Sequence, residues 1–271
     1  MGGNLRWCNE KICYINCISI LSMFRTTVAN KLKSDKNDFR FRGHEVRRIE
    51  AFSDAVFAFA VTLLIVSLEV PKNFEELMVT MRGFFAFGVS FVLLMMIWYE
   101  QNIFFRRYGM DDLRTIVLNC TLIFLVLFYV YPLKFLFTLV FGSQIYEEGH
   151  SPFIIRVTDI PKLMMIYGVG YILIYLLFTF MYMHALKKKT ELALTAGEIF
   201  DTRTKLFKNC LLIAIGLLSI LVSQVIPAAD AGLAGMVYIL IGPVFSIFYK
   251  YRAQRKRKLP ALDILAPPPA I

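Results

Sequence analysis

The sequence is 271 residues long and 58% hydrophobic, with 25 phenylalanines and a formal net charge of +10. It contains several runs of about 20 residues with almost no charge, the length that a helix needs to cross a bilayer. These features exclude an ordinary soluble domain and predict an all-α, multi-pass membrane protein.

Basic residues gather on one side of the predicted topology. Of the 30 lysines and arginines, 25 precede the first apolar run or lie in the second-to-third connection, the fourth-to-fifth connection or the tail. Cytoplasmic connections carry such an excess, so the pattern predicts a plasma-membrane protein with both termini cytoplasmic and an even number of spans. The same stretches suit anionic lipid headgroups, and the net charge therefore indicates topology and lipid contact, with no nucleic acid partner.

The chain divides into three predicted parts. Residues 1–47 form a basic cytoplasmic extension, 48–250 a six-helix transmembrane domain, and 251–271 a basic, proline-rich cytoplasmic tail. An apolar stretch at 12–23 is too short to span a bilayer; an interfacial segment or a coding start downstream fits the charge pattern better than a cleaved signal. The six predicted spans are 48–70, 81–104, 113–141, 161–184, 206–226 and 231–249.

The first predicted span, 48–70, opens with charged and hydroxyl residues and then becomes apolar. A carboxylate such as Asp54 costs about 2.5–3.5 kcal/mol within a membrane helix unless it faces protein or water, so its presence indicates a function. Steps of alternately four and three residues return to one face of a helix. From Arg48, these steps define one stripe, which consists of Arg48, Phe52, Ala55, Phe59, Thr62, Val66 and Glu69.

This stripe has two interpretations. If several copies surrounded an axis, Phe59 and Val66 would form apolar constrictions and Thr62 a ring of hydroxyls. Glu69 would add negative charge at the outer mouth, and such a bore favours cations, while Ser53 and Asp54 would hydrogen-bond to neighbouring helices. Small and polar residues also mark helix contacts in membranes, so a packing seam explains the same spacing. Spacing alone leaves both interpretations open.

The start of this span also carries a recognisable motif. Arg48, Phe52, Ser53 and Asp54 form R-x-x-x-F-S-D, which resembles the signature of the prokaryotic branch of the transmembrane protein 175 potassium channel family. The resemblance implies a potassium-preferring cation channel whose first helix lines the pore, built as a homotetramer of single six-helix repeats. Potassium ions would be the permeant species, and the resemblance implies no cofactor. It extends more weakly to Trp98, Asn119 and Pro132.

The resemblance also suggests roles for single residues. The family's narrowest hydrophobic ring, usually a branched aliphatic residue, falls on Phe59, which would close the pore more tightly or shift the constriction to Val66. Thr62 matches a threonine linked to potassium preference. Gln101 and Asn102 replace histidines of many relatives, which keeps hydrogen bonding but removes a group that titrates near neutral pH. The predicted supporting residues are Trp98, Asn102 and Asn119.

The later spans offer few groups with evident chemistry. Lys134 could pair with an acid or reach the outer interface, and we expect the second. His150 and His184 are isolated in the sequence, so we expect them in a loop and at the membrane interface, respectively. Cys120 and Cys210 lie in or beside apolar spans, where packing is the expected role.

Other function classes fit less well. The sequence contains no Gly-rich phosphate loop, no histidine pair at metal spacing and no Ser/His/Asp set, so we expect neither an enzyme nor a metal site. The main alternative is a proton-coupled secondary transporter that uses Asp54 as its intramembrane carboxylate. Transporters usually have repeated halves with broken helices, and here Gly242-Pro243 alone resembles such a break. A non-conducting membrane scaffold also stays open.

Overall fold

The structure, a computed structural model, describes residues 39–43, 45–66, 73–74, 77–78, 81, 84–142 and 159–257. Within these ranges the regular elements are helices, which confirms the all-α class. They are α2 (Arg48–Val66), α4 (Phe84–Tyr108), α5 (Leu113–Gly142), α6 (Ile160–Lys187), α7 (Ala196–Val225), the 3₁₀ helix η2 (Ala228–Leu240) and α8 (Ile241–Arg257).

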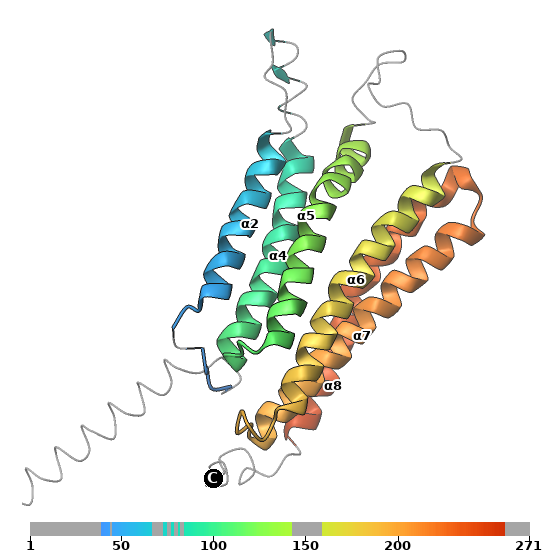
Figure 1. Cartoon of the computed structure of the whole chain (residues 1–271). Helices are drawn as coiled ribbons and strands as arrows, with labels where there is room; N and C mark the ends of the chain where they lie inside the picture. The colour runs from blue at the N-terminus through green and yellow to red at the C-terminus, as the bar shows by residue number, and fades with distance from the viewer. Residues whose placement is uncertain are drawn as a thin grey trace, which may run out of the picture.

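The helices form an elongated bundle in which consecutive helices run in alternating directions (Figure 1). Helices α2, α4 and α5 lie on one side, while α6, α7 and α8 lie on the other, and α5 packs against α6 between them. Helix α2 contacts α4 and α5 and lies at the edge of the bundle. The start of α2 and the end of α8 lie at the same end of the molecule, the lower end in Figure 1.

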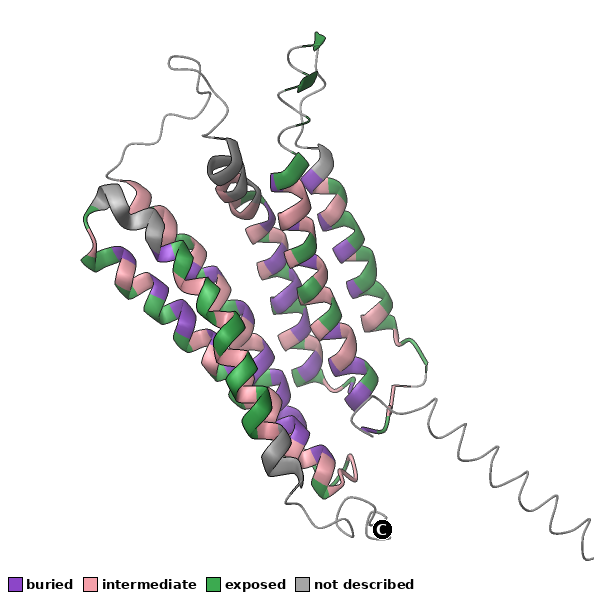
Figure 2. Cartoon of the chain, turned by 180° about the vertical axis from the view of Figure 1, so that it is seen from behind, coloured by how far each residue is buried: buried purple, intermediate pink, exposed green. Residues whose placement is uncertain are grey.

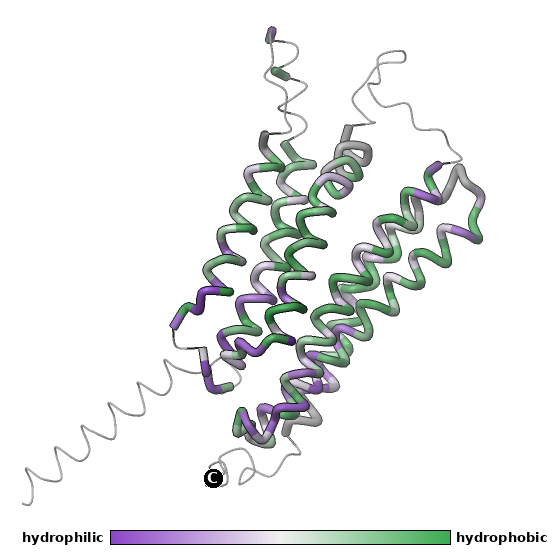
Figure 3. The backbone as a smooth tube through the Cα atoms, in the orientation of Figure 1, coloured by the Kyte–Doolittle hydropathy of each residue, from purple (hydrophilic) through white to green (hydrophobic). Residues whose placement is uncertain are grey.

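Hydrophobic residues predominate along the middle of the helices, as membrane helices require (Figure 3). Five helical stretches are long and apolar enough to cross a membrane: Phe84–Tyr108, Leu113–Leu133, Ile160–Lys187, Ala196–Val225 and Ala234–Arg252. They correspond to the second through sixth predicted spans. Helix α2 is not among the five, and its described 19 residues include the charged Arg48, Glu50 and Asp54.

Helix α7 begins ten residues before the predicted span at 206–226. Thr195 caps the helix by accepting a hydrogen bond from the Glu198 backbone N–H, and the Glu198 side chain accepts one from the Thr195 N–H. This capping box satisfies two backbone donors at the helix start. The early turns are polar, and hydropathy therefore places the boundary too late.

The last predicted span, 231–249, changes helix type along its length. It starts in η2, a 3₁₀ helix, and continues as α8 from Ile241. The change comes just before the Gly242-Pro243 pair in which the sequence predicts a break. Pro243 lies in the first turn of α8, where a missing backbone N–H removes no helical hydrogen bond.

Residues 39–43 form a short segment, the N-terminal strap, that binds the rest of the molecule. Phe39 is fully buried, with its ring edge-on to Tyr108 at 5.5 Å between centroids. The backbone N–H groups of Arg42 and Gly43 both donate to the Arg106 carbonyl at the end of α4, at 3.0 and 3.1 Å. A side chain at Gly43 would lie 2.7 Å from the Phe105 carbonyl oxygen, so glycine permits this close approach.

The guanidinium of Arg42 joins the strap to the second half of the chain. It donates to both carboxylate oxygens of Glu198, at 2.7 and 3.1 Å, and to the carbonyls of Leu192 and Ala193 before α7. The sequence places these residues in the basic extension of 1–47, and the structure shows that 39–43 pack on the helical domain.

Candidate functional site

Helix α2 has one face buried in the bundle and one face exposed. Ser53, Phe57, Ala60 and Leu64 repeat at steps of four and three residues and are at most 2% exposed. The predicted stripe lies on the other face: Phe52 is 55% and Phe59 58% exposed, and Arg48, Ala55 and Thr62 are also exposed. The alternation of buried and exposed residues along α2 is visible in Figure 2. The described part of the stripe therefore does not pack against the other described helices of this chain.

The outer end of the stripe lies outside the residues that the structure describes. Helix α2 is described to Val66, although nothing is stated of the Val66 side chain, and Glu69 lies outside the described residues. The predicted second constriction and the predicted charged mouth are thus not located.

The hydroxyl of Thr62 donates its hydrogen within α2. Its Oγ1 donates to the carbonyl of Phe59 at 2.7 Å, within the same helix. A hydroxyl that donates in this way keeps two lone pairs for other partners. Because Thr62 lies on the exposed face, its oxygen is an acceptor directed away from α4 and α5.

Three helices are joined on the buried side of α2 by a chain of hydrogen bonds, the polar relay. Gln101 Nε2 of α4 donates to Asn119 Oδ1 of α5 at 2.6 Å, and Asn119 Nδ2 donates to Ser53 Oγ at 2.8 Å. Ser53 then donates to the Ile49 carbonyl at 2.7 Å. Gln101, Asn119 and Ser53 are each at most 2% exposed, so the bonds form where water does not compete.

Asp54 is held by a different residue. Trp98 Nε1 of α4 donates to Asp54 Oδ1 at 2.7 Å, in an exposed position beside the relay. The bond brings together two residues that the sequence analysis singled out separately. Asp54 thereby fixes α2 to α4 on the flank of the helix, one residue away from the buried serine.

The relay differs from the sequence prediction at one point. Asn102 was the predicted supporting residue, whereas the residue that bonds Asn119 is Gln101; Asn102 is half-buried beside it. A helix turns by about 100° per residue, so neighbouring positions point in different directions. No local signal in the sequence distinguishes the two, because the choice depends on where α5 lies.

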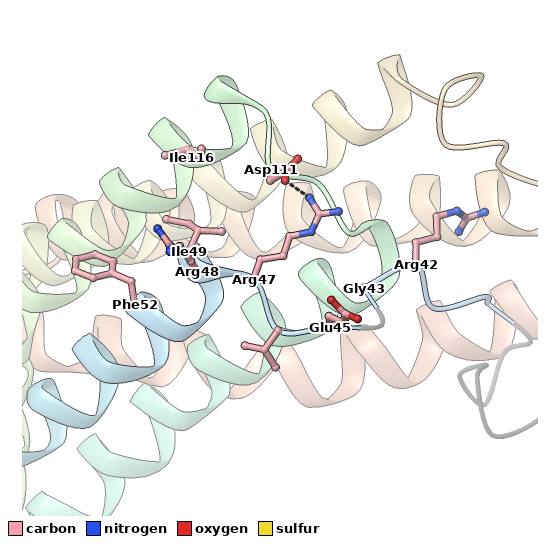
Figure 4. Close-up of a pocket in the computed structure, with 10 residues that line it drawn as sticks. Arg42, Gly43, Glu45, Arg47, Arg48, Ile49, Phe52, Asp111 and Ile116 are labelled. Carbon is pink, nitrogen blue, oxygen red and sulfur yellow. Dashed lines mark ion pairs between the residues drawn. The ribbon is translucent and has the colours of Figure 1, made fainter.

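A large hollow lies where α2 begins, and Figure 4 shows the residues around it. Its volume is about 840 Å³. Arg48 and Phe52 of the motif line it together with Arg42 and Arg47, and Arg47 forms an ion pair with Asp111 at 2.6 Å. The exposed stripe of α2 therefore starts at a wide opening whose wall carries more positive than negative groups.

His184 is not isolated, contrary to the sequence prediction. Its Nε2 lies 2.6 Å from Asp112 Oδ2, and Thr115 Oγ1 donates to the other carboxylate oxygen of Asp112 at 2.8 Å. Burial alone would raise the pKa of Asp112, but the hydrogen bonds from Thr115 and His184 outweigh it and hold the pKa below its ordinary value of 3.8. The pair joins the α4–α5 connection to the end of α6.

Groups that bind metals are sparse in the described part of the chain, where no three His, Cys, Asp or Glu side chains come together. The arrangement around α2 instead offers an exposed hydroxyl, exposed aromatic rings and a rigid polar support. Such groups suit the passage or binding of a hydrated ion.

The sequence is similar to those of known potassium channels. The family model of the endosomal/lysosomal potassium channel TMEM175 matches residues 48–132. A potassium channel from Marivirga tractuosa is 39% identical over 236 residues, which are 82% of this chain and 94% of that protein. A potassium channel from Chamaesiphon minutus is 32% identical over 96 residues, 32% of this chain and 47% of that protein.

The fold has a solved counterpart. The crystal structure of a variant of the potassium channel MtTMEM175, in complex with a nanobody–MBP fusion, matches with a TM-score of 0.72 and 38% identity, over 82% of this chain and 99% of that chain. These relatives are potassium channels and not enzymes. Because a relative with 39% identity is matched over nearly its whole length, the chain belongs to the prokaryotic branch of the TMEM175 potassium channel family.

Proposed function

We propose that this protein is a potassium-preferring cation channel in which four copies surround a pore lined by α2. The supporting observation is the exposed stripe on α2, whose opposite face is buried against α4 and α5. Exposed aromatic rings next to the hydroxyl of Thr62 and an aspartate suit a protein–protein or pore surface better than lipid alone. The relatives named as potassium channels agree with this function.

In the proposed pore, Phe59 and Thr62 form adjacent layers. Four Phe59 rings narrow the bore to an apolar ring, which gates by excluding water. Four Thr62 oxygens lie one turn further along and accept contacts from a partly dehydrated cation, since each hydroxyl hydrogen is engaged with the Phe59 carbonyl. Val66 would supply a second apolar ring, and Glu69 a ring of negative charge that concentrates cations at the outer mouth.

The motif residues off the pore face hold the pore helix in position. Ser53 and Asp54 bind α5 and α4, respectively, and so fix the rotation of α2 about its own axis. A rotation of α2 would move both Phe59 and Thr62 away from the pore. Arg48 and Phe52 would line the cytoplasmic entrance, next to the hollow at the start of the helix.

The same proposal fixes the orientation in the membrane. The described chain begins and ends at one end of the bundle, where the basic stretches gather, and we infer that this end is cytoplasmic. Helix α2, the first span in chain order, then brings the number of spans to six together with the five apolar stretches described above. The membrane is a plasma membrane whose anionic headgroups contact the basic connections.

The decisive experiment is the reversal potential of the purified protein in planar bilayers under a potassium-to-sodium gradient. We expect a potassium-directed potential, and a higher unitary conductance in Phe59→Ala because the ring that narrows the bore is removed. Phe180→Ala is the matched control: Phe180 is 45% exposed on α6, away from α2, and its loss is expected to leave conductance unchanged.

Two outcomes would contradict the proposal. Equal effects of Phe59→Ala and Phe180→Ala would show that α2 does not line the pore. Absence of unitary current, with proton-coupled uptake into liposomes that Asp54→Asn abolishes, would instead establish the secondary transporter.

A further inference from the structure

A cluster of charged side chains lies where α4, α7 and α8 meet, on the opposite side of the bundle from the stripe of α2. Glu100 of α4 pairs with both Lys205, at 2.8 Å, and Lys208 of α7. Asp201 of α7 accepts a hydrogen bond from Arg252 of α8 at 2.6 Å. Arg107 of α4, 4% exposed, lies in the same group.

The charges in this cluster do not balance within the described part of the chain. Three cations, Lys205, Lys208 and Arg252, face the carboxylates of Glu100 and Asp201, and the side chains of the three cations are at most 19% exposed. Arg107 is a fourth cation in this cluster and has further contacts of its own. Removing a cation from water costs several kcal/mol unless a counter-charge compensates it. At least one positive charge among the three therefore calls for negative charge from elsewhere.

A small cavity opens among these residues. It has a volume of about 30 Å³ and is lined by all four cations together with Asp201 and Thr204. The buried Nε of Arg252, one of the lining residues, has no hydrogen-bond acceptor among the described residues. A buried donor of this kind costs about 1–3 kcal/mol when it stays unsatisfied, so an acceptor in the cavity would stabilise the fold.

The cavity has room for a small anion. Its volume of about 30 Å³ exceeds the roughly 10–15 Å³ that one water molecule requires. The cations that line the cavity come from α4, α7 and α8, so positive charge approaches the ion from several directions. A spherical anion can accept contacts from all of them.

We propose that this cavity binds a small inorganic anion of the size of chloride, held by Lys205, Lys208, Arg107 and Arg252. The ion supplies part of the missing negative charge and gives Arg252 Nε an acceptor. It joins α4, from the half of the bundle that contains α2, to α7 and α8 of the other half. This site is separate from the proposed pore and is independent of potassium conduction.

The test compares thermal unfolding of the purified full-length protein in potassium chloride and in potassium gluconate at equal ionic strength. Gluconate is too large for the cavity. We expect the unfolding midpoint to rise with the logarithm of the chloride concentration once the site fills, and to stay constant in gluconate. Arg252→Gln should need roughly tenfold more chloride for the same rise, because one charge-assisted hydrogen bond is lost.

Arg203→Gln is the matched control, since Arg203 is an exposed arginine on α7 outside the cavity and its loss removes the same charge. Its chloride response should equal that of the unmodified protein. Equal midpoints in the two salts, or equal responses of the two variants, would overturn the proposal. If Arg252→Gln does not fold, anomalous diffraction from bromide-soaked crystals decides: a bromide peak in the cavity supports the site, and an empty cavity refutes it.

Discussion

The indole nitrogen of Trp98 lies 2.7 Å from a carboxylate oxygen of Asp54, so that a side chain of α4 holds the acid of the motif. A hydrogen bond to an ionised acceptor is roughly twice as strong as a neutral one. The bond fixes the position of the motif aspartate beside the proposed pore.

The bond predicts how substitutions at these two positions combine. Asp54→Ala and Trp98→Phe should each destabilise the protein by roughly 1.5–3 kcal/mol, and the double variant should lose little more than one of them. We expect damage to assembly or gating, with the reversal potential little changed. Unfolding curves and single-channel recordings of the three variants test this. If Asp54→Ala altered selectivity alone, a positioning role would be wrong.

Asn119 should be the most sensitive residue of the polar relay because it bonds on both sides. Asn119→Leu leaves the buried side chains of Gln101 and Ser53 without one partner each, at a cost of about 1–3 kcal/mol for each unsatisfied group. The control is Asn102→Leu, the neighbouring half-buried amide, which should cost much less. The amount of oligomer recovered on size exclusion and its unfolding midpoint provide the measurement. Equal losses in the two variants would argue against the relay.

The sequence predicted the helices better than the contacts between them. The apolar runs are long and uniform, so hydropathy placed the second to fourth spans within a few residues of helices α4, α5 and α6. Helix α7 starts earlier, and helix α8 ends later, than the predicted spans. The capping box of Thr195 and Glu198 and the bonds to the strap lengthen α7 with polar residues. These contacts satisfy polar groups that a hydropathy window counts as evidence against a helix in the membrane.

The residues that support α2 also show that sequence patterns do not predict contacts between helices. Trp98 and Asn119 were predicted because the family resemblance marks them, while Gln101, His184 and Arg42 depend on partners far away in the sequence. His184 meets Asp112, 72 residues distant, and Arg42 meets Glu198, 156 residues distant. No periodicity connects such positions, and they become visible once the packing of the helices is known.

Thr62 should affect ion preference rather than stability. Thr62→Val keeps the shape of the side chain but removes the oxygen, so we expect a reversal potential closer to zero under a potassium-to-sodium gradient and a nearly unchanged unfolding midpoint. Thr62→Ser retains the hydroxyl and should keep most of the preference. A Thr62→Val channel with unaltered selectivity would rule out a coordinating role for this oxygen.

The two arginines of the strap should differ sharply. Arg42→Gln removes the paired hydrogen bonds to the buried Glu198 carboxylate and should cost roughly 1.5–3 kcal/mol. Arg40 is 51% exposed and its Nε lies 3.7 Å from the same carboxylate, so Arg40→Gln should cost about 0–1 kcal/mol. Hydrogen exchange of the strap amides would report the difference directly. Similar exchange rates in both variants would mean that the paired bonds do not hold the strap.

Acid should weaken the link between Asp112 and His184. The pKa of Asp112 is lower in the folded protein than its ordinary 3.8, so its contribution is fully present above that value and is lost as the pH falls through the folded pKa. We expect the difference in unfolding midpoint between the unmodified protein and Asp112→Asn to be constant near pH 5 and to shrink below about pH 4. Glu45→Gln, at an exposed carboxylate, controls for general acid effects. If the difference in unfolding midpoint persisted at lower pH, the stabilisation would not come from the ionised Asp112 carboxylate.

The distance in sequence between Arg42 and Glu198 also sets an order of events during biosynthesis. The acceptor is made 156 residues after the donor, which is a delay of about 8–30 s at ordinary rates of translation. Throughout that time α2, α4, α5 and α6 enter the membrane while the strap has no carboxylate to bind. A nascent protein truncated before α7 would keep the contacts of the strap with α4 but leave the Arg42 guanidinium without the Glu198 carboxylate.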